Sequence, residues 1–264
     1  MLVTVKATPQ PSERYGDTSC VAGIRIDGDE PSWIRLYPIA FRWLDGDAQF
    51  KKYDVITVST RPAGADLRPE SRKIDAEGIS VISHVRDWRS RSTWIEPLVG
   101  PSMCELISGT QADVNAQSLA ALRPRRVKDI EFSRHEGWSA RQLEQFDAYK
   151  NQGDLFRETP ARVLEAPRWI VHLRYECESE NCHGHSQRII DWELTALQAR
   201  FRNRSDADLM TAVRRNFFEI PFAADRAPLI LVGNQESITR RSSFTVLGIY
   251  YPRRSDVQQA ERLF

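Results

Sequence analysis

Apolar and polar residues alternate with a period of two through much of the first hundred residues. The alternation is clearest in segments rich in β-branched residues: LVTVKA (2–7), CVAGIRI (20–26), WIRLYPI (33–39), DVITVST (54–60) and GISVISHV (78–85). This pattern is typical of strands with one buried face. Gly and Asp residues at 16–17, 27–29 and 45–47 supply turns between the segments. The sequence therefore predicts a small antiparallel β-barrel over residues 1–100.

The hydrophobic pattern changes after residue 100. SMCELISG (102–109) and NAQSLAALR (115–123) predict short helices, and RRVKDIEF (125–132) predicts a strand. ARQLEQFDAYK (140–150) predicts a longer helix, preceded by Ser139 and Gln142 at the spacing of a capping box. NQGDLFRETPARV (151–163) has the composition of an exposed connector. We therefore predict a helical connecting region over residues 101–165.

The remaining residues, 166–264, mix both periods. RWIVHLRYEC (168–177) alternates like a half-buried strand, and apolar residues from Ile190 to Phe201 fall on one face of a helix. A second helix is expected from near Ser205 to before Pro221, and PLILVGN and SFTVLGIYYP predict closing strands. The whole chain is thus predicted to be α+β, with a mixed C-terminal domain over 166–264.

Composition changes this picture little. The 264 residues are 41% hydrophobic and 28% charged, as in an ordinary globular protein of one large or two modest domains. The 37 basic and 36 acidic side chains nearly cancel, so only local patches can indicate a polyanionic partner. The N-terminus lacks a secretory signal, and no apolar run approaches the length of a membrane span. We therefore expect a cytoplasmic protein that does not bind membranes.

The most specific chemistry lies in CESENCHGH, residues 177–185. Cys177, Cys182 and His185 form a C-x4-C-x2-H knuckle, in which a turn brings two thiolates and an imidazole around one ion. Zinc suits this set because it accepts sulfur and nitrogen ligands tetrahedrally. The fourth ligand is open: His183 is adjacent, Asp191 and Glu193 follow, and water would leave the site catalytic.

Two other interpretations of the knuckle remain. A disulfide between Cys177 and Cys182 is disfavoured in a reducing compartment, and a merely polar loop leaves the clustering unexplained. Cys20 and Cys104 are isolated in the sequence, and we interpret both as buried small apolar residues.

IIDWE (189–193) offers a second chemical interpretation. On a strand, Asp191 and Glu193 would share one face and could share a divalent ion, with Glu193 acting as a general base. On a helix, Asp191 would cap the N-terminus and Glu193 would favour its positive end, with Trp192 in the core. The sequence favours the helical interpretation.

Several cationic segments are candidates for nucleic-acid contacts. RDWRSRSTW (86–94) mixes Arg86, Arg89 and Arg91 with Trp88, which is suited to phosphate contacts and base stacking. RPRRVK (123–128) adds Arg125 and Arg126. On the expected strand 33–39, Arg35 and Tyr37 share a face. Solvated charged faces and a polar outer strand face are the simpler explanations.

Parts of the chain resemble known proteins. FKKYDVITV (50–58) resembles the strand entry of small barrels of the PUA and EVE type, which bind RNA or modified bases. Together with VKATPQPSERYGDTSCVAGI, WIRLYPIAFRWL, LRPESRKI and the signature C-x4-C-x2-H-x5-DWE, it also resembles a family of hypothetical bacterial proteins. This resemblance implies an architecture, a metal site and a bacterial origin, but no reaction.

Two functional hypotheses follow. The first is a nucleic-acid-binding protein, of DNA or RNA, in which a closed zinc knuckle is structural. The second is a metal-dependent hydrolase or nuclease with an open metal near Asp191 and Glu193. The chain lacks the P-loop, the dinucleotide fingerprint, the serine-hydrolase elbow and the zinc-deaminase signature. The fourth coordination position discriminates between the two hypotheses.

Overall fold

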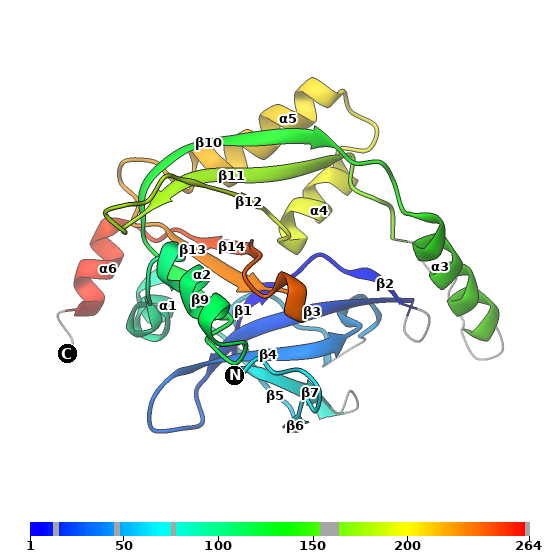
Figure 1. The fold of residues 1–264 in the computed structure, drawn as a ribbon, viewed down its shortest axis with the longest axis horizontal. Coiled ribbons are helices and arrows are strands. Elements are labelled where there is room, and N and C mark those ends of the chain that lie inside the picture. Colours follow the sequence, from blue (N-terminus) through cyan, green and yellow to red (C-terminus); the bar gives the residue numbers. More distant parts are fainter. Residues whose placement is uncertain (13–15, 45–47, 75–77, 154–163, 262–264) are drawn as a thin grey trace.

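The computed structural model describes residues 1–12, 16–44, 48–74, 78–153 and 164–261 (Figure 1). In the view of Figure 1, a curled sheet from the first third of the chain lies below, a second sheet arches above it, and a third lies between them. The fold is therefore mixed α+β, as predicted.

The curled sheet orders its strands β6-β7-β4-β3-β1-β5-β8, with β2 paired to β3. All its pairs are antiparallel except β4 with β7. Its edge strands β6 and β8 do not pair with each other in the described part of the chain, so the sheet is a half-barrel. The predicted small antiparallel barrel is not confirmed. The strands are β1 (Leu2–Lys6), β2 (Gln10–Ser12), β3 (Gly16–Arg25), β4 (Ser32–Ile39), β5 (Asp54–Thr57), β6 (Thr60–Pro62), β7 (Ser71–Ile74) and β8 (Ser80–His84).

The middle sheet, β9 (Leu119–Leu122), β13 (Leu229–Asn234) and β14 (Phe244–Tyr250), separates two apolar cores. On β13, Ile230 and Val232 face the core under the arching sheet, whereas Leu229 and Leu231 face the core shared with the half-barrel. Both faces are covered, which explains why β13 is continuously apolar from Leu229 to Val232.

The same sheet corrects one sequence prediction. Residues 115–123 were expected to form a helix, but their apolar part is strand β9, paired with β13. The run LAAL is buried at every position and so has no period that distinguishes a strand from a helix. The expected helical connecting region is not confirmed either, because it contains β9 and β10 as well as two helices.

The arching sheet consists of β10 (Pro124–Arg134), β11 (Trp169–Cys177) and β12 (His185–Arg188). Helices α4 (Trp192–Arg200) and α5 (Asp206–Arg214) follow it, and α5 continues into a π-helical turn, Arg215–Glu219. Asp191 caps α4 and Ser205 caps α5 by accepting hydrogen bonds from backbone N–H groups of the first turn. Both helix starts agree with the sequence predictions.

The other helices are α1 (Trp88–Ile95), α2 (Met103–Ala112), α3 (Ala140–Gly153) and α6 (Arg254–Glu261), with short 3-10 turns at Phe41–Trp43, Glu96–Leu98 and Ile238–Arg240. Ser139 and Gln142 exchange the hydrogen bonds of a capping box before α3, as predicted. Most of the expected connector, residues 154–163, lies outside the described residues.

The segment after β12 joins the sheets. The backbone N–H of Thr8, just after β1, donates to the Ile190 carbonyl at 2.6 Å, and the Ile190 N–H donates to the Val246 carbonyl at 2.8 Å. The half-barrel, the middle sheet and the start of α4 therefore meet at residues 189–191.

Candidate metal centre and central cavity

Four side chains with metal-binding atoms meet beneath the arching sheet. Cys177 ends β11, Cys182 lies in the following turn, His185 begins β12, and Cys104 lies in the first turn of α2. The ligand atoms of these residues all lie within 4.8 Å of one another. Cys177 and Cys182 are buried, and the other two are half-buried. We refer to these four residues as the Cys/His cluster.

The spacing within the cluster suits one tetrahedral ion. His185 Nε2 lies 3.3 Å from Cys182 Sγ, 3.4 Å from Cys177 Sγ and 3.6 Å from Cys104 Sγ. The Sγ atoms of Cys104 and Cys177 are 3.5 Å apart, too far for a disulfide. Tetrahedral coordination of zinc at ordinary bond lengths separates sulfur and nitrogen ligands by about 3.5–3.8 Å. The cluster could therefore hold a metal ion with little movement.

The local backbone holds Cys182 in place. The backbone N–H groups of Cys177 and Gly184 both donate to Cys182 Sγ, each at 3.4 Å. Gly184 adopts φ +100°, a conformation that residues with a Cβ rarely adopt. The C-H-G-H turn therefore needs a glycine at this position to direct its N–H at the sulfur.

Neighbouring groups make the thiols unequal. Burial opposes ionisation of Cys177, but hydrogen bonds from the Cys104 backbone and from His185 lower its pKa to about 6. Burial and the adjacent Cys177 raise the pKa of Cys104 to about 12. Without a cation, crowded thiols cannot all ionise, because like charges repel. A divalent ion would remove that conflict, since thiolates are the form that binds metals.

A second layer of contacts supports His185. The ring of Tyr175, its partner on β11, lies 5.3 Å from the imidazole centroid to centroid. The Tyr175 hydroxyl donates to Gln187 Oε1 at 2.7 Å, and Gln187 Nε2 donates to Met103 Sδ at 3.0 Å. These buried contacts tie β11 and β12 to the helix that carries Cys104.

The structure brings together the predicted ligands Cys177, Cys182 and His185. It adds a fourth residue, Cys104, which was expected to be a buried apolar residue. Cys104 is not an isolated apolar residue: it supplies the fourth ligand atom. Its one signal in the sequence was a cysteine beside a helix start, 73 positions before Cys177. His183, the adjacent candidate, is exposed and is not a member of the cluster.

Asp191 and Glu193 have other partners. Lys52 Nζ lies 3.0 Å from Asp191 Oδ2 and 3.2 Å from Glu193 Oε2. Asp191 also accepts the Glu193 N–H as the cap of α4. Burial opposes the charge of Lys52, but the two carboxylates outweigh it and raise its pKa, whereas burial raises the pKa of Asp191 despite Lys52. The capping interpretation of these two residues agrees with the structure.

The predicted nucleic-acid contacts divide into two sets. Arg35 is buried and donates to the backbone carbonyls of Asn234 and Ser118, each at 3.0 Å. Arg91 is also buried, with its guanidinium 3.8 Å from the centre of the Tyr53 ring, and Trp88 packs against Tyr250 and Tyr251. Arg35, Arg91 and Trp88 are therefore parts of the folded core.

The second set reaches solvent. Arg86 and Arg89 flank the start of α1 and are exposed, as is Tyr37 on β4. Arg125 and Arg126 are exposed on β10, where both pair with the Glu176 carboxylate, at 3.2 and 3.1 Å. These five residues remain accessible for a partner.

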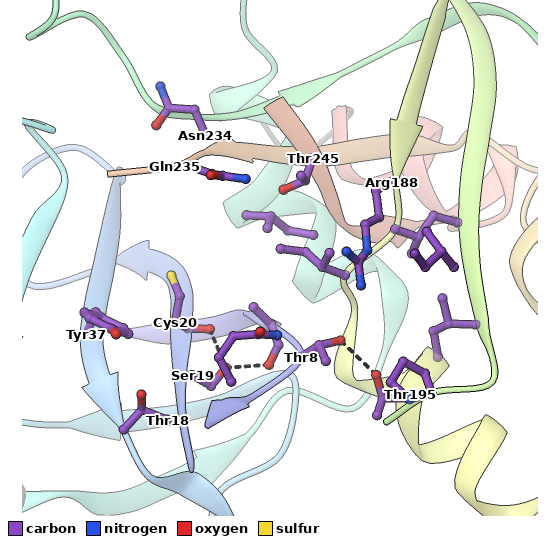
Figure 2. Close-up of a pocket in the computed structure, with 18 of the residues that line it drawn as sticks. Thr8, Thr18, Ser19, Cys20, Tyr37, Arg188, Thr195, Asn234, Gln235 and Thr245 are labelled. Atoms are coloured by element: carbon purple, nitrogen blue, oxygen red, sulfur yellow. Dashed lines mark hydrogen bonds between the residues drawn. The ribbon is translucent and has the colours of Figure 1, made fainter. Parts of the chain in front are cut away.

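A cavity of about 420 Å³ lies at the junction of the sheets (Figure 2). Its walls come from Ala7 and Thr8 after β1, from β2 and β3, from β4 with Arg35 and Tyr37, from the start of β11 and the end of β12, from α4, and from β13 and β14. Hydroxyl groups are among the lining groups: the Oγ1 atoms of Thr8 and Thr195 lie 2.9 Å apart. We refer to this feature as the central cavity.

Arg188, the last residue of β12, extends its guanidinium into the central cavity (Figure 2). Within the described part of the chain, this guanidinium has no hydrogen-bond or ion-pair partner. Burial alone lowers the pKa of Arg188, and no carboxylate offsets it. The sequence analysis did not identify Arg188, because nothing in its local pattern shows that the folded chain leaves it unpaired.

The fold and the site define the chain as a mixed α+β protein with a buried Cys/His cluster beside a central cavity. Residues 99–264 match the model of the family described as Domain of unknown function (DUF8757), and residues 1–97 match Domain of unknown function (DUF8758). The chain therefore belongs to the DUF8757 family. No curated protein matched the chain. Among the described helices, none has the length and apolar character needed to cross a membrane.

Proposed function

We propose that this protein binds nucleic acid and that a zinc ion in the Cys/His cluster has a structural role. The observation that carries the choice of role is the position of Cys104, whose Sγ lies with those of Cys177 and Cys182 and with His185 Nε2, all within 4.8 Å. Four protein ligands close a tetrahedral site and leave no position for a reactive water.

The ligand chemistry favours zinc among the metals. Three thiolates and one imidazole form a soft, tetrahedral donor set, which zinc accepts without a geometric preference of its own. Thiolate ligands also need a reducing environment, so the proposal includes a cytoplasmic location. Metal binding would then stabilise the junction of α2, β11 and β12, because a structural zinc site forms only in the folded chain.

The hydrolase hypothesis has less support. A catalytic metal needs an open position and a carboxylate free to accept a proton. The two candidates, Asp191 and Glu193, instead share Lys52, and Asp191 is 1% exposed and caps α4. We therefore propose a binding protein and not a nuclease.

Nucleic acid is the proposed partner because unpaired guanidinium groups are available at separate places. Arg86 and Arg89 are exposed and have no ion-pair partner in the described residues. The exposed Tyr37 ring lies at the central cavity, which also holds Arg188. Guanidinium groups with an accessible aromatic ring suit a phosphate backbone with unstacked bases. The resemblance of residues 50–58 to PUA and EVE barrels favours the same partner.

Metal analysis and binding assays on purified protein test the proposal. We expect about one zinc per chain, bound single-stranded DNA or RNA, and affinity that falls steeply with salt, because each neutralised phosphate releases counterions. The double variant Arg86→Gln/Arg89→Gln should bind more weakly and show a shallower salt dependence than wild type. Arg202→Gln and Arg61→Gln, each of which removes one exposed charge, serve as controls.

Two results would refute the proposal. Absence of zinc in protein prepared without chelators would remove the structural-metal role. Absence of binding to either nucleic acid at low salt would remove the function. Glu193→Gln gives a third comparison: reproducible cleavage of DNA or RNA by wild type that disappears in a folded, zinc-loaded Glu193→Gln variant would favour the hydrolase.

A further inference from the structure

The central cavity has the size and composition of a ligand pocket. Its volume of about 420 Å³ lies within the range of about 300–1,000 Å³ typical of small-molecule sites. Its walls are largely apolar, with Ala7, Ile189, Ile190, Leu194 and Leu247, and polar groups occur at a few places among them. Such a lining binds a ligand by shape and orients it through a small number of hydrogen bonds.

The charge of the lining favours an anion. The lining side chains include the guanidinium groups of Arg35, Arg68 and Arg188 and the single carboxylate of Glu236. Arg68 is neutralised by Asp66, with Arg68 Nη2 2.7 Å from Asp66 Oδ2. Arg188 has no counterpart of this kind in the described residues. Even a half-buried charge without a partner lowers stability, so it is retained where a ligand supplies the opposite charge.

The hydrogen-bonding groups favour a ligand rich in acceptors. Arg188 offers its whole guanidinium, which has no hydrogen-bond or ion-pair partner among the described residues. A guanidinium presents paired N–H groups in a plane, which matches two oxygens of a phosphate. Three threonine hydroxyls also line the cavity: those of Thr8 and Thr195 lie together on one side of Arg188, and that of Thr245 lies apart from them (Figure 2).

The opposite wall holds an aromatic ring. Tyr37 lies across the cavity from Arg188 in Figure 2 and is 43% exposed. An accessible ring is a stacking surface for a planar group, and stacking on aromatic residues accepts any base. The end of the cavity at Arg188 therefore suits a phosphate, the lining hydroxyls suit a sugar, and the end at Tyr37 suits a base.

We propose that the central cavity binds a single nucleoside monophosphate unit, with its phosphate at Arg188 and its base against Tyr37. The unit is either a free mononucleotide or one unstacked nucleotide of a bound strand. In the second case the inference rests on the proposed nucleic-acid function and assigns its specificity site. In the first case the inference stands without that function.

Calorimetric titration of the zinc-loaded protein with AMP, GMP, CMP and UMP, with the matching nucleosides and with inorganic phosphate tests the proposal. At least one monophosphate should bind about tenfold or more tightly than its nucleoside, because the charge-assisted bonds to Arg188 need the phosphate. Arg188→Gln should abolish this difference. Tyr37→Leu should lower the affinity for the monophosphate and leave any binding of inorganic phosphate unchanged. Tyr37→Phe, which keeps an aromatic ring, should retain the affinity for the monophosphate.

Matched variants separate pocket effects from general charge effects. Arg202→Gln removes one charge from an exposed turn and should change mononucleotide affinity less than about twofold. Arg188→Lys keeps the charge but loses the paired N–H geometry, and should retain part of the phosphate preference. Zinc content and thermal unfolding of each variant establish that it is folded before it is titrated.

The outcomes separate this inference from the proposed function. If a strand binds, competes with the mononucleotide and depends on Arg188, both are supported, with the strand as the source. If mononucleotides bind through Arg188 but strands do not bind, the cavity is a free-nucleotide pocket and the proposed function fails. If strands bind but no monophosphate binds, and Arg188→Gln leaves strand affinity unchanged, the pocket inference is overturned while the proposed function stands.

Discussion

The Cys/His cluster and the central cavity share strand β12, but they differ in whether their polar groups have partners. His185 at the start of the strand faces the cluster, and Arg188, three positions on, faces the other side, because successive residues of a strand alternate. In the cluster every ligand atom lies close to the others. In the cavity the Arg188 guanidinium has no partner within the described residues.

This difference indicates what each site is for. A group of atoms that can all contact one ion could hold that ion as part of the fold, and its binding energy would then be folding energy. A charged group left unpaired in a half-buried space lowers stability until a ligand arrives, a common compromise at binding sites. Removing a paired group should therefore be costly, whereas removing Arg188 should cost little stability and should abolish only the phosphate preference.

The largest expected effect follows from breaking the cluster. Cys104→Ser should reduce bound zinc from about one per chain to well below half and lower the melting temperature by about 10 °C or more, because metal binding stabilises the junction of α2 with β11 and β12. Elemental analysis and calorimetry measure both. Cys20→Ser is the control, since Cys20 lines the central cavity and is not a cluster member. Full zinc content in Cys104→Ser would contradict the four-ligand site.

Cys104 also shows how far the sequence could predict the site. Cys177, Cys182 and His185 lie within nine positions of one another, so their spacing alone indicated a shared ion. Cys104 reaches them only because α2 packs under β11, a contact between segments more than 70 positions apart. Arg188 was missed for the related reason that the absence of a partner depends on the whole fold.

The fold was predictable where the signals are local. Capping residues gave the starts of α3, α4 and α5, and alternation gave β10 and β11. Strand β9 was predicted as a helix because both of its faces are buried, one in each of the two cores, by segments that lie far along the chain. The open edges of the half-barrel were not predictable, since the strand order depends on pairs that are not consecutive in the chain, such as β4 with β7.

A second paired site, Lys52 with Asp191, should also be costly to break. The side chains are 9% and 2% exposed, and they join the half-barrel to α4. Lys52→Met should destabilise the fold by about 3–5 kcal/mol, because it leaves the Asp191 charge buried without its partner. Urea unfolding measures this, and Lys51→Met, at the exposed neighbour, is the control. The double variant Lys52→Met/Asp191→Asn should recover part of the loss.

A smaller effect is expected in the turn of the cluster. Gly184→Ala forces a Cβ into a backbone with φ +100°, at a cost of about 1–2 kcal/mol. The N–H bond to Cys182 Sγ should weaken, so zinc should be lost to a competing chelator faster than from wild type. Gly137→Ala has a similar φ of +90° but lies away from the cluster, so it should share the strain without the zinc loss. Equal zinc loss in both variants would contradict the assigned role of Gly184.

The ion pair of Asp66 with Arg68 gives a pH-dependent test beside the cavity. Burial raises the pKa of Asp66, but the hydrogen bonds from Arg68 outweigh it and lower the pKa to about 2. A lowered folded pKa means that the stabilisation is present above the ordinary value of 3.8 and is lost as the pH falls from there toward 2. Asp66→Asn should remove about 1 kcal/mol at neutral pH and flatten the stability curve in that acidic interval. An unchanged curve in urea unfolding at several pH values would show that the pair contributes nothing.

The smallest effect on stability should come from Arg188. Because its guanidinium has no partner among the described residues, Arg188→Gln should leave the free energy of unfolding within about 0.5 kcal/mol of wild type, or raise it. Arg68 provides the matched comparison, since it also lines the cavity but is paired with Asp66. Arg68→Gln should destabilise by about 1–3 kcal/mol, because it leaves a half-buried carboxylate without its donors. Urea unfolding of the two variants without ligand measures the contrast directly.

Equal destabilisation would mean that Arg188 stabilises the fold, and the distinction between a closed cluster and an open cavity would then fail. A stable Arg188→Gln protein that has lost its phosphate preference would instead show that the unpaired guanidinium does not stabilise the ligand-free fold. Its contribution would then be to ligand binding alone.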